Sequence, residues 1–249
     1  IKNLHTLQMF GCAQLRNWEV LENLSNLQTL TLTNISNYPF FIESLSCLPL
    51  LRELDLSGCK KLSNSKVSLP NLQILHLSGV GTKWSGPLVH LRYLLENTEG
   101  LSHVQYLNLS NNPKLELIDG LGILPNLSTL SLRECRVLKS IAGLQARAPT
   151  LRDLSLSGCQ RLVSLSGIEG MQHLQHLDLT GCSTIKSIEE LKEIKTLTSL
   201  NLSKCKAISD YSPLRELDNL RRLTLSKRLV GSDVIADVQT FLPHVEISR

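Results

Sequence analysis

The chain has 249 residues, of which 42% are hydrophobic and 19% are charged. This balance is typical of a water-soluble globular protein and argues against an intrinsically disordered chain. The net charge of +4 falls short of the concentrated basic stripe that nucleic-acid binding requires, and no run of eighteen apolar residues that could span a membrane occurs.

One nine-residue pattern recurs along the chain at nearly constant spacing. It reads apolar-x-x-Leu-x-Leu-x-x-Cys, with Asn or another residue sometimes at the last place, and a clear copy runs from Leu174 to Cys182. A repeat of this regularity predicts a solenoid in which each copy stacks on the next. The ten copies begin near residues 4, 27, 51, 72, 104, 127, 151, 174, 197 and 220.

Each copy combines a strand with a long return. The alternation at Leu177, Asp178 and Leu179 is typical of a half-buried strand, and like-directed strands need such a return. After Cys182, apolar residues recur at every third position, which favours short 3₁₀ turns and loops over α-helices. The sequence therefore predicts a single α/β solenoid domain over residues 1–249, with a parallel concave sheet of about ten strands and a thin convex side.

Two segments interrupt this rhythm before the C-terminus. Residues 37–41 contain three aromatic side chains, which either enlarge the local core or form an exposed contact patch. About nine extra residues lie within the insertion 81–100, where residues 87–95 have the pattern of a short amphipathic helix. This insertion is either a plain convex helix or a functional loop. Because Ile1 already lies in repeat register, we expect the N-terminal flank to lie outside this sequence.

The last twenty-one residues, 229–249, are predicted to form a C-terminal cap. Ser232 is placed to N-cap a helix that continues to Phe241 and ends before Pro243. Residues 245–247 then resemble one last half-strand. Such a cap would shield the final leucines of the solenoid from water.

The cysteines follow the repeat rather than a disulfide framework. Their odd number and repeat spacing favour buried, reduced thiols and an intracellular, cytoplasmic protein, although disulfides between neighbouring repeats remain an alternative. Five Asn-x-Ser sequons are the competing signal for secretion, and two of them, at Asn108 and Asn201, would place glycans on the strand face. Cysteines closing the repeat pattern are Cys12, Cys59, Cys135, Cys159, Cys182 and Cys205; Cys47 falls near an apolar position.

The sequence contains no motif that indicates catalysis. It lacks a phosphate-binding glycine loop, a Gly-x-Ser-x-Gly elbow and a His-Glu-x-x-His motif. A metal site at His173, His176, Asp178 and Cys182 is disfavoured, because strand alternation directs these side chains to different faces. We therefore expect a protein that is no enzyme and needs no cofactor.

The polar positions beside the strand leucines are the candidate binding surface for another protein. Tyr106, Arg133 and Arg152 are the strongest candidates for a central patch, because Tyr and Arg are enriched among interface hot spots. Alternatively, each is a solvated strand residue without a partner. The candidate protein-binding residues are Arg52, Asp55, His76, Tyr106, Asn108, Arg133, Arg152, Asp153, His176, Asp178 and Arg222.

Residues 151–159 and 197–210 resemble cysteine-containing leucine-rich repeats. Residues 208–214 are similar to the repeats of kinetoplastid leucine-rich-repeat proteins, and residues 54–62 are equally similar to the leucine-rich-repeat domains of plant nucleotide-binding immune receptors. The resemblance implies a leucine-rich-repeat horseshoe that recognises a partner and does not catalyse a reaction. It implies a protein-binding scaffold or regulatory module or, alternatively, a sensor domain that restrains an attached nucleotide-binding switch.

Overall fold

The computed structural model of the protein describes residues 3–12, 18–35, 42–59, 67–80, 98–99, 101–118, 121–226 and 231–248. The aromatic segment 37–41 and the helix expected at residues 87–95 lie outside the described residues. The described part of the insertion 81–100 is therefore limited to residues 98–99.

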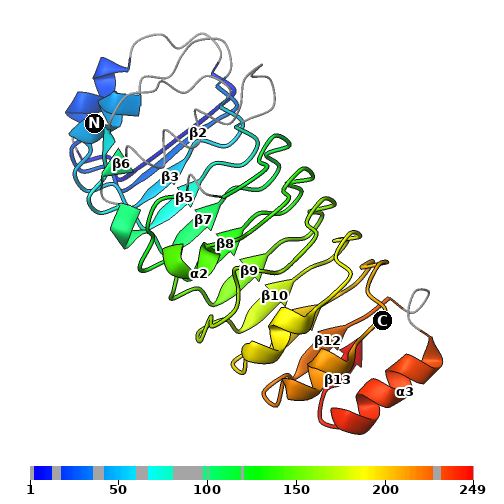
Figure 1. The fold of residues 1–249 in the computed structure, drawn as a ribbon. Coiled ribbons are helices and arrows are strands. Elements are labelled where there is room, and N and C mark those ends of the chain that lie inside the picture. Colours follow the sequence, from blue (N-terminus) through cyan, green and yellow to red (C-terminus); the bar gives the residue numbers. More distant parts are fainter. Residues whose placement is uncertain are drawn as a thin grey trace.

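One open, parallel sheet of eleven strands runs through the molecule (Figure 1). Ten strands coincide with the ten repeats and the eleventh with the expected last half-strand, which confirms the predicted solenoid with its concave parallel sheet. Its strands are β1 (Thr6–Phe10), β2 (Thr29–Thr33), β3 (Glu53–Asp55), β5 (Ile74–His76), β7 (Tyr106–Asn108), β8 (Thr129–Ser131), β9 (Asp153–Ser155), β10 (His176–Asp178), β11 (Ser199–Asn201), β12 (Arg222–Thr224) and β13 (Glu246–Ser248).

The strands pair without any shift of register, so equivalent repeat positions become neighbours. The central leucines of β9, β10 and β11, which are Leu154, Leu177 and Leu200, are paired across the sheet and are buried. Because side chains alternate along a strand, the residues on either side of each central leucine face the solvent. The sheet therefore presents two parallel columns of polar side chains across its open face.

The returns on the convex side contain short helical turns, as the three-residue period predicts (Figure 1). The 3₁₀ turns are η1 (Glu19–Asn23), η2 (Ile42–Cys47), η3 (Leu101–His103), η4 (Glu189–Glu193) and η5 (Ser212–Glu216). One return forms a single α-helical turn instead, α2 (Leu144–Arg147). A two-stranded sheet of β4 (Val67–Ser68) and β6 (Thr98–Glu99) joins two returns and was not predicted, because neither segment has a strand-like alternation.

Helix α3 (Ser232–Phe241) confirms the expected helix near the C-terminus (Figure 1). Ser232 is its first helical residue, however, and Gly231 is the N-cap, because Gly231 has the extended backbone that precedes the first turn. The assignment of Ser232 as the N-cap was therefore wrong by one residue. Ile235 and Val238 are buried, and the Arg215 guanidinium lies 4.9 Å from the centre of the Phe241 ring.

The residue before each repeat cysteine adopts a left-handed backbone conformation. Glycine occupies this position at Gly58, Gly158 and Gly181, which explains the recurring Gly-Cys sequence. Lys204 adopts the same conformation, with φ of 62°, although its Cβ makes that conformation unfavourable. The turn geometry is therefore imposed by the stacked repeats and not by glycine alone.

Replacement of Lys204 by glycine should stabilise the protein. Lys204→Gly is expected to raise the free energy of unfolding by about 1 kcal/mol, because removal of Cβ strain outweighs the additional backbone freedom of the unfolded chain. Its backbone N–H, which donates to Ser226 Oγ at 2.7 Å, is retained. Urea unfolding would measure the change. Lys204→Ala, which keeps the Cβ, is the control; an equal gain in this variant would show that the lysine side chain and not the backbone is the cause.

Candidate functional site

The candidate site is the open face of the eleven-stranded sheet, which we name the concave face. Its first column consists of the residues just before the central leucines, or isoleucine in β13, and its second column consists of the residues just after them. Most of these residues are partly exposed. The first column is Thr6, Thr29, Glu53, Ile74, Tyr106, Thr129, Asp153, His176, Ser199, Arg222 and Glu246. The other column is Gln8, Thr31, Asp55, His76, Asn108, Ser131, Ser155, Asp178, Asn201, Thr224 and Ser248.

Several side chains in the second column close the turn at the end of their strand. The backbone N–H of Ser57 donates to Asp55 Oδ1 at 2.8 Å, and that of Thr180 donates to Asp178 Oδ1 at 3.0 Å. Asn108 accepts the equivalent bond in its own repeat, at 3.0 Å. Three of the predicted binding residues therefore also shape the turn, a role of Asp and Asn that is common where strands end.

An aromatic pair lies on β5 and β7. The rings of His76 and Tyr106 have centroids 5.1 Å apart and are tilted by 44°. Ile74 is paired with Tyr106 in the register, so an apolar side chain lies next to the ring. Glu53 and Asp55 occupy the neighbouring strand β3. The structure thus brings the predicted residues Asp55, His76 and Tyr106 together in one patch.

A second group of predicted residues meets on β9 and β10. His176 Nε2 lies 3.9 Å from Asp153 Oδ1, and Ser155 Oγ donates to Asp178 Oδ2 at 3.3 Å. The hydroxyl of Thr180 also donates to Asp178 Oδ1, at 2.6 Å. These groups are partly exposed, so they form a polar surface rather than an enclosed site.

The predicted arginines lie mainly beside the strands rather than on them. Arg52 and Arg152 each precede a strand by one residue, and Arg133 lies in the turn after β8. In the repeat that contains β9, Ser157 occupies the position that Arg133 has in its own repeat. Ser157 lies five residues after Arg152, so Arg133 and Arg152 are about 16 Å apart along the strand direction. The expected central patch of Tyr106, Arg133 and Arg152 is therefore spread over both ends of the strands. Arg222 alone of the predicted arginines is on a strand, at the start of β12.

Buried thiols form a column behind the sheet. Cys59, Cys135, Cys159, Cys182 and Cys205 are free and buried, as predicted, but Cys12 and Cys47 are only partly buried. Cys12 follows β1, the edge strand, which has a neighbouring strand on one side only. Each buried thiol donates to a leucine carbonyl of an earlier repeat, for example Cys182 to Leu156 at 3.2 Å. Equivalent bonds join Cys59 to Leu32, Cys135 to Leu109, Cys159 to Leu132 and Cys205 to Leu179.

Asn112 takes the place of cysteine in this column and makes the same link. Its Nδ2 donates to the carbonyls of Leu77 at 2.9 Å and Leu109 at 2.8 Å. Asn112 is fully buried, so its amide replaces a thiol as the donor between two repeats. The sequence pattern permitted Asn at this position but did not reveal the shared hydrogen bond.

The buried thiols are poor candidates for catalytic nucleophiles. Burial raises the pKa of Cys135 to about 11 and that of Cys182 to about 12, whereas a nucleophilic cysteine needs a lowered pKa. Among the described residues, no three His, Cys, Asp or Glu side chains are grouped so that they could hold a metal ion. No helix in the described part of the chain is both long and apolar enough to cross a membrane.

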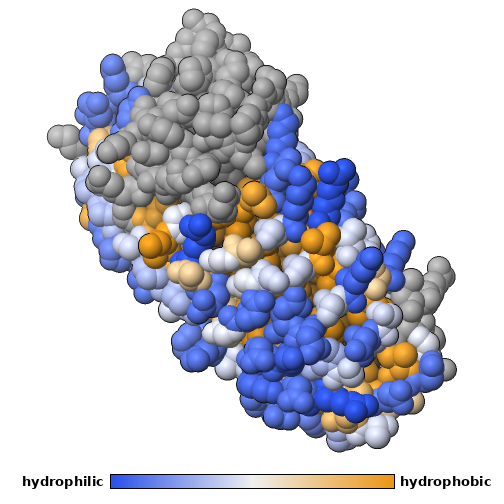
Figure 2. All heavy atoms as spheres, in the orientation of Figure 1, coloured by the Kyte–Doolittle hydropathy of each residue, from blue (hydrophilic) through white to orange (hydrophobic). Residues whose placement is uncertain are grey.

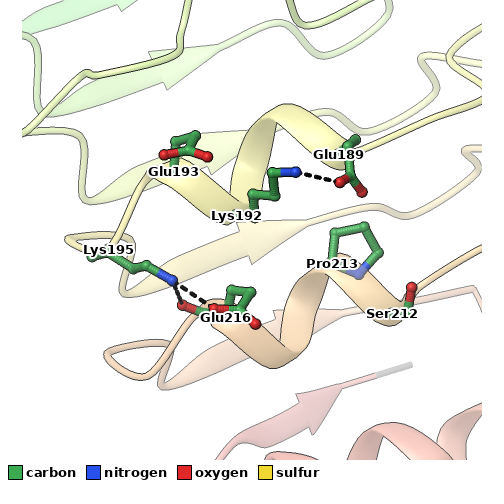
Figure 3. Close-up of a pocket in the computed structure, with 7 residues that line it drawn as sticks. All are labelled: Glu189, Lys192, Glu193, Lys195, Ser212, Pro213 and Glu216. Atoms are coloured by element: carbon green, nitrogen blue, oxygen red, sulfur yellow. Dashed lines mark hydrogen bonds and ion pairs between the residues drawn. The ribbon is translucent and has the colours of Figure 1, made fainter.

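The convex side has an open, charged depression between η4 and η5 (Figure 3). Lys192 Nζ lies 2.5 Å from Glu189, and Lys195 Nζ lies 3.0 Å from Glu216. The Lys195 ammonium lowers the pKa of Glu216 by hydrogen bonding and charge, and Glu189 raises the pKa of Lys192 in the same way. Because these charges are paired, the depression provides weaker support for a ligand site than the concave face.

Exposed hydrophobic side chains do not define another site. Among the described residues, the most exposed large ones are Ile123 at 73%, Phe10 at 65% and Val163 at 64%, and no two of them lie in the same repeat or in adjacent repeats. On the face that Figure 2 draws, hydrophilic residues cover much of the described part, with hydrophobic areas between them. This distribution favours recognition by polar groups on the side chains over a broad apolar contact.

Comparison with known proteins identifies the repeats. Models described as leucine-rich repeats match residues 149–193 and 194–210. No curated protein has a significantly similar sequence. The match to these models agrees with the repeat positions of β9, β10 and β11.

Three solved structures are similar in fold. Internalin C2 from Listeria monocytogenes has a TM-score of 0.55 and 23% identity, with 89% of this chain and 80% of that chain covered. A functional domain of InlJ from Listeria monocytogenes, described as including a cysteine ladder, has a TM-score of 0.56 and 17% identity, with 90% and 44% covered. A TLR13–ssRNA13 complex has a TM-score of 0.62 and 20% identity, with 100% and 36% covered.

All three sequence identities are below 25%, so these similarities show a shared fold and nothing more. They agree with the open parallel sheet, its one strand per repeat and its thin convex side. The matched repeats at residues 149–210 and the similarity in fold together show that this chain has the fold of a leucine-rich-repeat solenoid.

Proposed function

We propose that the protein is a non-catalytic scaffold or regulatory module that binds a partner protein on its concave face. The observation that carries this proposal is the pair of columns of mostly polar, mostly partly exposed side chains along eleven strands. A rigid sheet of this kind can hold a partner without a large conformational cost. The seven free cysteines support an intracellular, cytoplasmic location for this function.

The charges on the concave face favour protein over nucleic acid as the partner. The two columns include Glu53, Asp55, Asp153, Asp178 and Glu246, whereas Arg222 is their one arginine or lysine. Phosphates would be repelled at these five carboxylates and attracted at one arginine of the two columns. The RNA in the TLR13–ssRNA13 complex belongs to that protein, and the charges on this chain argue against the same ligand class here.

Site-specific photocrosslinking tests the proposed surface. Benzoylphenylalanine at Thr129 or Ser199, both on the concave face, is expected to capture a protein from a cell extract of the source organism. The same group at Gln145 or Lys186, both exposed in the returns, is the control. Adducts specific to Thr129 and Ser199, detected by mass spectrometry, would support the proposal. Adducts confined to Gln145 and Lys186, or none at any position, would contradict it.

A further inference from the structure

Three carboxylates of the returns are paired with lysines, whereas two carboxylates of the concave face have no such partner. On the convex side, Glu116, Glu189 and Glu216 each have a lysine within 3.0 Å. Among the described residues, Glu53 and Asp55 have no ion-pair partner. The face is acidic although the whole chain has a net charge of +4. Charges left unpaired on an open surface can be complemented by a partner of opposite charge.

These carboxylates form two groups on the sheet. The first acidic group is Glu53 and Asp55 on β3. The Tyr106 ring lies on the same face, two strand steps away on β7, with Ile74 and His76 of β5 between them. Within the described part of the chain, Glu53 has no hydrogen bond from another side chain, and Asp55 Oδ1 accepts a backbone N–H. The Tyr106 ring adds a second contact for a basic segment that crosses the sheet, because the face of an aromatic ring attracts positive charge.

The second acidic group is Asp153 on β9 and Asp178 on β10. Asp178 accepts from the neutral hydroxyls of Ser155 and Thr180, so its negative charge is not neutralised by these bonds. In the described part of the chain, Asp153 has one ion-pair neighbour, His176, at 3.9 Å. Both groups are partly exposed and can be reached from solvent.

The sheet determines the separation of the two acidic groups. β3 and β9 are four strand steps apart in the order of the sheet, and β3 and β10 are five. Strands lie about 4.8 Å apart, so the groups are separated by about 19 to 24 Å. An extended peptide that crosses the strands spans this distance with about six to seven residues, at about 3.3 Å per residue.

We propose that the concave face binds an extended segment of a partner protein that carries two basic side chains about six to seven residues apart. One basic side chain pairs with Glu53 and Asp55, and the other pairs with Asp153 and Asp178. Between the two groups, the peptide crosses the rings of His76 and Tyr106 and then the small side chains of Thr129 and Ser131. This inference rests on the proposed protein-binding function and specifies the chemistry of its partner.

Fluorescence anisotropy with three labelled Gly-Ser peptides tests the inference at low salt. One peptide carries two arginines about six residues apart, the second carries two adjacent arginines, and the third carries two glutamates at the wider spacing. The spaced arginine peptide is expected to bind most tightly, because only it reaches both acidic groups. Equal binding of the two arginine peptides, or tighter binding of the glutamate peptide, would overturn the proposal.

Variants of the intact chain locate the contact. Glu53→Gln and Tyr106→Leu are each expected to weaken binding of the spaced arginine peptide by about 2- to 5-fold, the range for an exposed cation contact. Glu246→Gln is the matched control, since it removes the same charge from the same face at the far end of the sheet. If Glu246→Gln weakened peptide binding equally, the attraction would come from the overall negative charge of the face, and the proposed site would be rejected. If a protein crosslinks at Thr129 but the variants do not weaken peptide binding, the inference is rejected and the proposed function stands.

Discussion

The free energy of unfolding is expected to fall steeply as the pH rises above about 9. Burial raises the pKa of Cys59, Cys135 and Cys205 to about 11, and that of Cys182 to about 12, from an ordinary value of 9.0. The folded chain therefore retains thiol protons that the unfolded chain has already released. Each such thiol lowers stability by about 1.4 kcal/mol per pH unit within this window.

The direction of this effect follows from the raised pKa values. The stabilisation is fully present below the unfolded-state pKa and is lost as the pH rises through the folded-state pKa. For Cys182 the window extends from 9.0 to about 12. Urea unfolding at a series of pH values between about 8 and 11 measures the slope.

Cys182→Val isolates one thiol from the lysines and tyrosines that titrate in the same range. The slope of stability against pH should become shallower by about one proton, or about 1.4 kcal/mol per pH unit. Ile185→Val is the matched control, because it removes a methylene group from the same core without removing a proton. If Cys182→Val and the unmodified chain had the same slope, the buried thiol would not contribute to the alkaline effect.

Asn112→Ala should lower the free energy of unfolding by about 2 to 4 kcal/mol. The substitution removes the amide that donates to the carbonyls of Leu77 and Leu109 and leaves a buried cavity. Asn112→Cys should recover most of this loss, because cysteine makes the equivalent link in five other repeats. Urea unfolding in the presence of a reducing agent measures both variants.

The control for Asn112 is Asn126→Ala. Asn126 Nδ2 also donates to a backbone carbonyl of an earlier repeat, Ser102 O at 2.7 Å, but this bond is exposed. Water can replace an exposed donor, so the expected cost is below about 1 kcal/mol. If Asn112→Cys were as unstable as Asn112→Ala, a thiol could not replace the amide and the link between repeats would depend on something other than this hydrogen bond.

The concave face shows which features of a binding surface the sequence can predict and which features need the tertiary structure. Alternation around Leu177 correctly identified Asp178 and His176 as surface positions of a strand. The enrichment of arginine among interface hot spots placed Arg133 and Arg152 in one expected patch, although they lie at opposite ends of the strands. Residue type could not separate the two ends, since that distinction depends on where each strand begins and ends.

The sequence by itself determined the ladder of strands, the thin returns and the buried column of thiols. In a solenoid with unshifted register, residues about one repeat apart become neighbours, so the period of the leucines already specifies which positions pack together. Only the tertiary structure decided that the rings of His76 and Tyr106 lie together, that Asn112 replaces a thiol, and that Glu53 and Asp55 lack ion-pair partners among the described residues. These features depend on the side-chain conformations of neighbouring repeats, and the repeat pattern leaves those conformations free.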